Sequence, residues 1–325
     1  MRGFLIGVVV VLVLAAGAFY AFSEPDIPRS VLEVKYAAPP SEFVDIGCPP
    51  PASDADMPAS ISERAHFRAR GAKNAPVLLL LHGSNASFLT WEPWSKALSD
   101  SYRVVAVDLP GHGLTGATPC HDYSQEGMVR FVHAFARKEG FRRFALAGNS
   151  MGGGVAARYA EEYPSDVSKL ILVDAAGMRV AGGSATPLAF QLARMPVINM
   201  VMLHITPRSL VTDGLNDAVI RKEIITGKMI DSYWDFARMT GTRQATLERF
   251  ALPYNSDVAD HIGDIKAPTL ILWGAEDRLI PVAAAAKFHK AISGSELIVY
   301  PKTGHIPMEE VADQSAKDVR AFLAK

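Results

Sequence analysis

The sequence predicts an α/β fold in which a mostly parallel central sheet is flanked by helices and carries an inserted helical lid. Short apolar runs, separated by helical stretches, recur from Pro76 onward, which is typical of parallel strands buried on both faces. Six such runs occur, at residues 77–83, 102–111, 143–150, 169–177, 268–277 and 296–305. Residues 178–264 interrupt this rhythm with helical sequence. We therefore expect one α/β core, split by a lid between its fourth and fifth parallel strands.

The composition excludes several classes of partner. The chain has 325 residues, 49% of them hydrophobic, which is enough for a sizeable core. Its 33 basic and 34 acidic residues leave a net charge of −1, so no broad positive field is available for nucleic acid. No zinc-type or redox-type spacing of Cys and His occurs, and the sequence predicts neither a metal nor an organic cofactor.

An uncharged apolar segment lies at the N-terminus. It runs for 19 residues, from Phe4 to Phe22, which as a helix would span about 28 Å of a bilayer. Arg2 precedes it and Glu24 and Asp26 follow, so the charge distribution places the rest of the chain outside the cytoplasm. We expect a retained anchor. A cleaved signal peptide is the alternative, because residues 16–18 read Ala-Gly-Ala.

Residues 23–60 are rich in proline and are expected to form a linker without helix, containing the first strand at 41–47. The alternating sequence at 62–71 predicts a second strand at the solvent edge of the sheet. If the chain is exported, Cys48 and Cys120 can form a disulfide; two free buried thiols are the alternative.

The residues Gly148-Asn149-Ser150-Met151-Gly152 follow an apolar strand and precede a helical stretch. They match the G-x-S-x-G pattern in which a sharp strand-to-helix turn exposes a nucleophilic serine. The glycines are expected where neighbouring elements come too close for a Cβ atom. We interpret Ser150 as the nucleophile.

A serine hydroxyl needs a base and an orienting carboxylate, which in this arrangement follow in the order Ser, acid, His. His305 lies in the loop after the last strand and is the expected base, whereas His289 lies in a helical stretch and is expected at the surface. Asp277 ends the fifth parallel strand and is the expected acid. Its rival is Asp174, one strand earlier.

Backbone N–H groups must hold the oxyanion that forms when the serine attacks. One should come from Met151, directly after the nucleophile, and the other from the loop that follows residues 77–81. Ser84 is the expected second donor, with Asn85 as the alternative.

Three polar residues near strand ends are expected to be structural rather than catalytic. His82 precedes the oxyanion loop and is expected to support it by hydrogen bonds. Asp108 and His112, in the sequence Asp-Leu-Pro-Gly-His-Gly, are expected to hold a turn.

Taken together, these motifs resemble the α/β-hydrolase superfamily, and in particular its lid-bearing serine esterase and lipase branch. The resemblance covers residues 41–325 and rests on His-Gly at 82–83, the turn at 108–113, the serine motif, Gly-x-x-Asp at 274–277 and Gly-His at 304–305. It implies hydrolysis of carboxylic esters through an acyl-enzyme. Hydrolases that cleave carbon–carbon bonds in ring-opened aromatics share the serine motif and are an alternative, as is a membrane-tethered binding protein without turnover.

The lid supplies the candidates for the substrate pocket. Met and aromatic side chains at helical spacing usually pack in a core, but flexible Met side chains also suit varied apolar substrates. The candidates, together with Asn85, are Met195, Met200, Met202 and Trp234.

The expected organisation is an anchor or signal segment at 1–22, a linker at 23–60, core halves at 61–177 and 265–325, and the lid at 178–264. The expected partners are an ester substrate and a membrane, with the catalytic body periplasmic or extracellular. The sequence predicts no oligomeric state.

Overall fold

The fold was analysed in a computed structural model. It describes residues 22–48, 62–178, 195–252 and 261–325, together with residues 17, 19, 20 and 180. Most of the apolar segment from Phe4 to Phe22 therefore lies outside the described residues, as do residues 49–61 and much of the first part of the lid.

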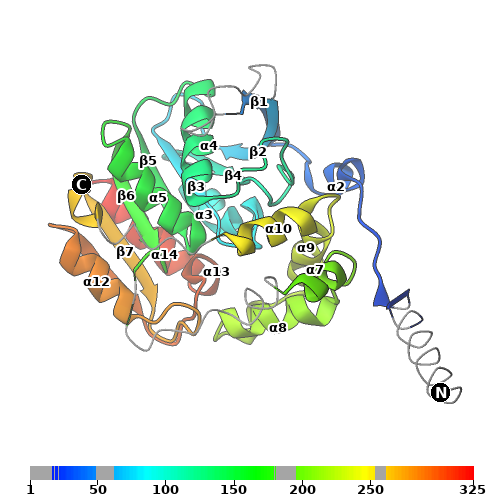
Figure 1. The fold of residues 1–325 in the computed structure, drawn as a ribbon. Helices are drawn as coiled ribbons and strands as arrows, with labels where there is room; N and C mark the ends of the chain where they lie inside the picture. The colour runs from blue at the N-terminus through cyan, green and yellow to red at the C-terminus, as the bar shows by residue number, and fades with distance from the viewer. Residues whose placement is uncertain are drawn as a thin grey trace, which may run out of the picture.

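Eight strands form one sheet in the described part of the chain (Figure 1). They are β1 (Ser41–Gly47), β2 (Ser62–Arg70), β3 (Val77–Leu81), β4 (Arg103–Val107), β5 (Phe144–Asn149), β6 (Val167–Val173), β7 (Thr269–Gly274) and β8 (Glu296–Tyr300). The spatial order is β1-β2-β4-β3-β5-β6-β7-β8. Strands β3 to β8 pair in parallel, and β2 pairs antiparallel with both β1 and β4. All six predicted parallel strands are present.

Helices cover both faces of the sheet because alternate strand residues point to opposite sides. One face packs on α4 (Gln125–Lys138), α5 (Met151–Glu162) and α12 (Ala283–Ala291). The other packs on η1 (Phe88–Trp91), α3 (Glu92–Leu98), α13 (Pro307–Glu310) and α14 (Ala312–Leu323). The central strands are almost entirely buried, which explains their continuous apolar sequence.

The lid helices gather at one end of the molecule (Figure 1). They are α7 (Pro196–Met202), α8 (Arg208–Ala218), α9 (Gly227–Ala237) and α10 (Thr242–Ala251), with short turns η2 (Lys222–Ile224) and η3 (Ile262–Asp264). They lie between β6 and β7 in the chain, where the sequence predicts the insertion.

Two predictions for the N-terminal part are wrong. The segment at 23–60, expected to lack helix, contains α2 (Arg29–Tyr36), whose Leu32 is buried. A helix can form here because the prolines of the segment lie outside these eight residues. The lid also stabilises the helix, since Asp235 accepts hydrogen bonds from Lys35 and Tyr36. Strand β2 is not at the edge, because β1 pairs with its free side.

Cys48 and Cys120 form a disulfide, so the first of the two predicted alternatives is present and the cysteines are not free thiols. It joins the end of β1 to the loop after β4, across a sequence separation of 72 residues. Among the residues described, no helix is long and apolar enough to cross a membrane.

Candidate active site

Ser150 occupies a strained turn between β5 and α5. Its backbone has φ 53° and ψ −119°, a conformation that a non-glycine residue adopts only where the surroundings enforce it. The enforcement is visible: Ser150 N–H donates to the Val173 carbonyl at 3.0 Å, and the Ser150 carbonyl accepts from Ala176 N–H at 2.9 Å. These bonds to the end of β6 fix the turn that presents the serine.

The two glycines of the motif are required by close approach. A Cβ on Gly148 would lie 2.1 Å from the Gly152 carbonyl oxygen, and one on Gly152 would lie 2.4 Å from that of Leu81. Both contacts are with backbone and are far inside van der Waals distance, so neither position can hold a side chain without moving β3, β5 or α5.

Asp277 and His305 meet at the ends of β7 and β8. His305 Nδ1 lies 2.7 Å from Asp277 Oδ2, and both residues are buried. The other carboxylate oxygen of Asp277 accepts from the N–H groups of Leu279 and Ile280, at 2.8 and 3.0 Å. Because a carboxylate receiving these bonds can only accept, the Nδ1 of His305 carries the proton, which leaves its Nε2 as the free acceptor.

Asn149 links the serine turn to the histidine loop. Its amide nitrogen donates to the backbone carbonyls of His305, at 3.0 Å, and Val173, at 3.2 Å. This contact brings the predicted nucleophile and base into neighbouring loops, although no hydrogen bond joins the Ser150 hydroxyl to His305 within the described ranges. Asn149 occupies a variable position of the serine motif, so the sequence carries no signal for its role.

Asp174, the rival acid, lies beside the Asp277–His305 pair. Polar atoms of the three residues all lie within 4.8 Å of one another. Asp174 Oδ1 accepts from Gly274 N–H at 2.9 Å. Burial first, and then the charge of Asp277, raise the pKa of Asp174 well above its ordinary value, whereas it is Asp277 that contacts the His305 ring.

These same three residues are the one group of potential metal ligands that the described residues bring together. The group does not fit a metal site well, because His305 Nδ1 already donates to Asp277, and carboxylate oxygens of Asp277 and Asp174 already accept backbone N–H groups.

The loop after β3 lies directly against the nucleophile. A Cβ on Gly83 would come within 3.1 Å of Ser150 Cβ and 2.9 Å of Asn149 Oδ1. The next residue, Ser84, is the predicted oxyanion donor, and Asn85 follows it with a positive φ of 61°. The predicted donors Ser84 and Met151 therefore come from the two segments that flank Ser150.

His82 supports this loop from below. Its Nδ1 lies 2.8 Å from the Gly83 carbonyl oxygen and donates to it, because a carbonyl oxygen can only accept. Its Nε2 accepts from Leu109 N–H at 3.0 Å. Burial lowers the pKa of His82, which favours the neutral ring that this pattern requires. The residue is structural, as the sequence predicts.

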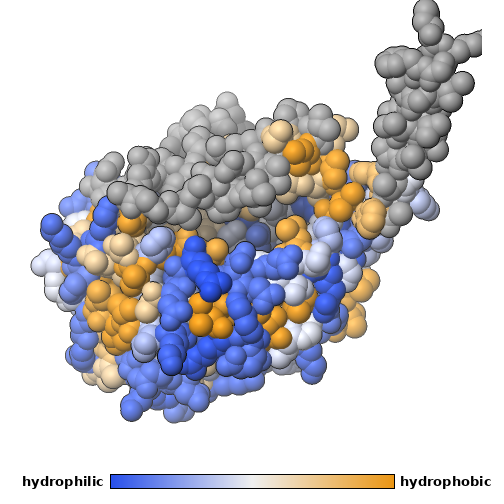
Figure 2. All heavy atoms as spheres, turned by 90° about the horizontal axis from the view of Figure 1, so that it is seen from below, coloured by the Kyte–Doolittle hydropathy of each residue, from blue (hydrophilic) through white to orange (hydrophobic). Residues whose placement is uncertain are grey.

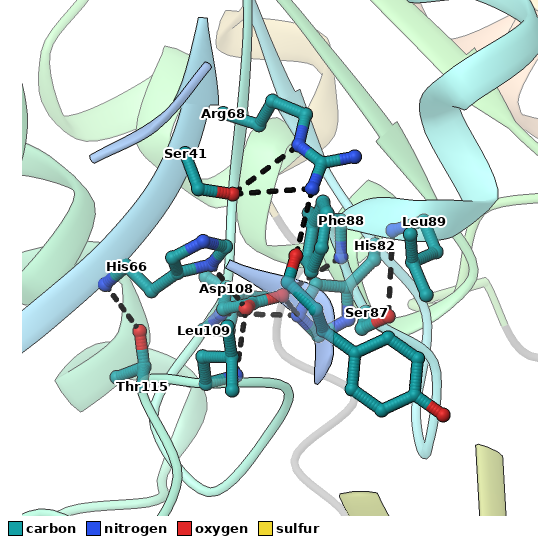
Figure 3. A network of polar contacts seen from close by, with 12 residues as sticks. Ser41, His66, Arg68, His82, Ser87, Phe88, Leu89, Asp108, Leu109 and Thr115 are labelled. Carbon is teal, nitrogen blue, oxygen red and sulfur yellow. Dashed lines mark hydrogen bonds and ion pairs between the residues drawn. The ribbon is translucent and has the colours of Figure 1, made fainter. Parts of the chain in front are cut away.

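Asp108 is the centre of the polar network behind the loop (Figure 3). Its fully buried carboxylate accepts from His66 Nδ1 at 2.7 Å, from Phe88 N–H at 2.7 Å and from Leu114 N–H at 2.8 Å. These bonds tie β2, η1 and the turn after β4 together. His112, nearby, is also buried and lies 2.9 Å from the Pro110 carbonyl through its Nδ1, so both residues are structural.

A buried glutamate positions the histidine loop from the other side. Glu310 Oε1 accepts from Gly304 N–H at 2.6 Å, and its Oε2 accepts from Ile220 and Arg221 N–H at 2.8 and 2.9 Å. His305 N–H itself donates to the Ala218 carbonyl at 2.7 Å. The lid segment after α8 thus holds the His305 loop, a role for Glu310 that sequence patterns do not indicate.

Of the five predicted pocket residues, the structure brings only Asn85 close to the serine. Asn85 lies in the loop beside it, and Met202 packs on the α10 residues Leu247 and Phe250. Met195 and Met200 instead expose 50% and 68% of their surface. The Trp234 indole donates to Thr206 and contacts Arg238, both within the lid.

Like Asn149 and Glu310, a third residue at the site was not predicted. Arg249 reaches from α10 to the oxyanion loop, where its guanidinium donates to Ser84 Oγ at 2.8 Å and to Asn85 Oδ1 at 3.2 Å. In the sequence it stands in Leu-Glu-Arg-Phe, a pattern that looks like an ordinary helix surface.

Comparisons with known proteins agree with this geometry. The profile of the α/β hydrolase fold family matches residues 76–311, and the chain belongs to this family of hydrolases. Human monoacylglycerol lipase ABHD6 is 30% identical over 280 residues, which cover 79% of this chain and 78% of the lipase.

Two further relatives differ in their named activities. The Escherichia coli (strain K12) 2-hydroxy-6-oxononadienedioate/2-hydroxy-6-oxononatrienedioate hydrolase is 28% identical over 274 residues, covering 81% of this chain and 91% of that enzyme. The crystal structure of a bacterial membrane phospholipase A superposes with a TM-score of 0.68 at 25% identity, covering 100% of this chain and 98% of the other.

Proposed function

We propose that this protein is a serine hydrolase that cleaves carboxylic esters of lipid type, with Ser150 as nucleophile, His305 as base and Asp277 as the orienting acid. The observation that carries the proposal is the buried 2.7 Å contact between Asp277 and His305, held beside the strained turn at Ser150. A turn of this strain persists only where the surroundings enforce it, and such turns concentrate at functional sites.

In the proposed reaction, the Ser150 hydroxyl oxygen attacks the ester carbonyl while His305 Nε2 takes its proton. The resulting tetrahedral intermediate collapses, the alcohol leaves with the proton from His305, and the acyl group remains on the serine. His305 then takes a proton from water, whose oxygen attacks the acyl-enzyme, and the acid is released as Ser150 regains its proton. Asp277 stabilises the imidazolium at each stage.

The oxyanion is proposed to lie between the backbone N–H groups of Ser84 and Met151. Such a donor is typically worth about 3–4 kcal/mol in the transition state. The close approach of Gly83 to Ser150 supports this position, since Ser84 directly follows Gly83 in the chain.

A lipid substrate and a membrane location are supported by separate observations. The named relatives include a monoacylglycerol lipase and a membrane phospholipase A. Apolar side chains are exposed near the described end of the N-terminal segment (Figure 2). Phe22, at that end, and Met200, on α7, are both largely exposed, and Phe19 contacts His204, two residues after α7. We propose that the N-terminal segment anchors the chain in a membrane next to the lid.

The proposed location of the catalytic body is outside the cytoplasm. The charge distribution around residues 4–22 supports it. The Cys48–Cys120 disulfide also supports it, since stable disulfides are rare in reducing compartments. A C-terminal alkaline phosphatase fusion should be active in a bacterial host, and an inactive but expressed fusion would contradict the orientation.

A carbon–carbon bond hydrolase is a second candidate, favoured by the 28% identity to the Escherichia coli enzyme. Turnover of monoacylglycerol and p-nitrophenyl esters by the detergent-solubilised full chain, measured beside Ser150→Ala, separates the two. Ester turnover that the substitution abolishes supports the proposal. Loss of all ester activity together with cleavage of a ring-opened dienoic acid would overturn it in favour of the second candidate.

A further inference from the structure

Arg249 brings a positive charge to the edge of the proposed oxyanion hole. Its Nη1 contacts Ser84 Oγ at 2.8 Å and Met151 Sδ at 3.6 Å, and its Nη2 contacts Asn85 Oδ1 at 3.2 Å. Ser84 and Met151 are the two residues whose N–H groups are proposed to hold the oxyanion. The guanidinium therefore lies beside the proposed oxyanion hole.

The acceptors that the described residues offer Arg249 are all neutral. Its neighbours in the lid differ: Arg208 pairs with Asp231 at 2.7 Å and Arg243 with Asp26 at 2.9 Å. Within the described residues, no carboxylate lies within 4.0 Å of the Arg249 guanidinium.

Arg249 stays protonated in this environment, but no described carboxylate neutralises its charge. Burial lowers the pKa of Arg249 to about 10, which still leaves it cationic at pH 7. The pKa of the nearby His112 is lowered first by the burial of its ring and second by the positive charge of Arg249. Arg249 is partly buried, and a partly buried cation that meets only neutral acceptors is costly; the cost falls when an anion binds.

We propose that Arg249 determines specificity by binding an anionic group, a carboxylate or phosphate, that the substrate carries close to its scissile ester. The planar guanidinium can donate two parallel hydrogen bonds to such a group. This inference rests on the proposed ester hydrolysis at Ser150. It adds that the preferred ester is charged, on either its acyl or its alcohol side.

Two matched substrate pairs distinguish the two sides. For the alcohol side, 1-oleoylglycerol 3-phosphate is compared with 1-oleoylglycerol, and for the acyl side, monoethyl adipate is compared with diethyl adipate. The kcat/KM of each is measured for the full chain, Arg249→Gln and Arg249→Lys. Arg208→Gln is the control, since it also removes a lid arginine but one that pairs with Asp231.

In at least one pair, Arg249→Gln should lower kcat/KM for the anionic ester by about 30-fold or more, while the neutral partner changes by less than about threefold. Arg249→Lys should recover part of the loss because it restores the charge, and Arg208→Gln should not discriminate. Equal effects on both members of both pairs would overturn the proposal and leave Arg249 as a clamp between lid and loop.

A second readout keeps the inference separate from ester turnover. Labelling of Ser150 by p-nitrophenyl alkylphosphonates, with and without a terminal carboxylate on the alkyl chain, reports on the anion preference even if no ester is hydrolysed. Turnover of the neutral esters by the unmodified chain tests the proposed function, whereas the ratio of charged to neutral rates tests Arg249. Labelling ratios that Arg249→Gln leaves unchanged, together with unchanged turnover ratios, would refute the role of the arginine alone.

Discussion

Gly83→Ala should impair catalysis through a single added methyl group. The new Cβ would lie 2.9 Å from Asn149 Oδ1 and 3.1 Å from Ser150 Cβ, both tighter than ordinary contacts. To relieve them, the loop that carries Ser84 must move by a few tenths of an ångström away from the nucleophile. Any shift of Asn149 is passed on to the His305 carbonyl, which accepts its hydrogen bond at 3.0 Å.

The expected effect follows from what one oxyanion donor contributes. Its complete loss typically costs about 10²–10³-fold in kcat, and a displacement of about 1 Å can cost about 10²-fold. For this smaller shift we expect kcat for p-nitrophenyl butyrate to fall by about 10- to 100-fold. The free energy of unfolding should fall by about 1–3 kcal/mol, the usual cost of overpacking.

Gly214→Ala is the matched control. Gly214 lies in α8, and a Cβ there would meet nothing within 4 Å. Its kcat should be unchanged, and its stability should stay equal or rise by up to about 1 kcal/mol because alanine favours helix. Gly83→Ala with the kcat of the unmodified protein would refute the position assigned to the oxyanion loop.

Three further predictions concern buried groups. Asp174→Asn, which keeps the side-chain volume and an acceptor oxygen, should keep at least about a third of kcat and be more stable than Asp174→Ala by about 1–3 kcal/mol in thermal unfolding, since the alanine leaves a cavity and an unpaired Gly274 N–H; equal stability would contradict the contribution of this hydrogen bond. Burial raises the pKa of Glu309 to about 7, so its contribution to stability is full below its ordinary pKa of 4.5 and is lost as the pH rises through 7. Glu309→Gln should therefore gain about 2 kcal/mol relative to the unmodified protein between pH 5 and pH 8.5, and parallel pH profiles in urea unfolding would refute this. Replacing Cys48 and Cys120 by serine should lower the free energy of unfolding by about 2–5 kcal/mol, whereas an unchanged denaturation midpoint under oxidising conditions would show that the bridge is not formed.

The strands and the serine turn could be predicted because they depend on local sequence. Continuous apolar runs identify buried parallel strands, and the spacing of Gly148 and Gly152 reflects the close packing of one turn. The strand-to-helix turn at Ser150 forms as the pattern predicts, and the carboxyl end of β7 lies beside the loop after β8, so Asp277 and His305 meet.

What the sequence could not predict depends on contacts between distant segments. Glu310 looks like a surface glutamate in a short helix, but its oxygens accept from backbone groups of residues 220, 221 and 304. Arg249 looks like a solvated position of α10 until the fold places it against Ser84. The helix α2 likewise depends on packing with the lid, because its Lys35 and Tyr36 both contact Asp235.

The lid shows where periodicity was insufficient. Met195, Met200 and Met202 have similar sequence contexts, yet Met202 packs on α10 whereas the first two are largely exposed. Which face of a short helix meets the core depends on how the neighbouring helices are placed, and a stripe of apolar residues does not carry that information.

Covalent labelling shows whether Ser150 is a nucleophile that His305 activates. The full chain is incubated with a fluorophosphonate, the adduct is mapped by peptide mass spectrometry, and the labelling rate is compared with that of His305→Ala. We expect one adduct, on Ser150, formed at least about 100-fold more slowly in the histidine variant. Failure to label Ser150 in the folded protein, or an equal rate without His305, would contradict it.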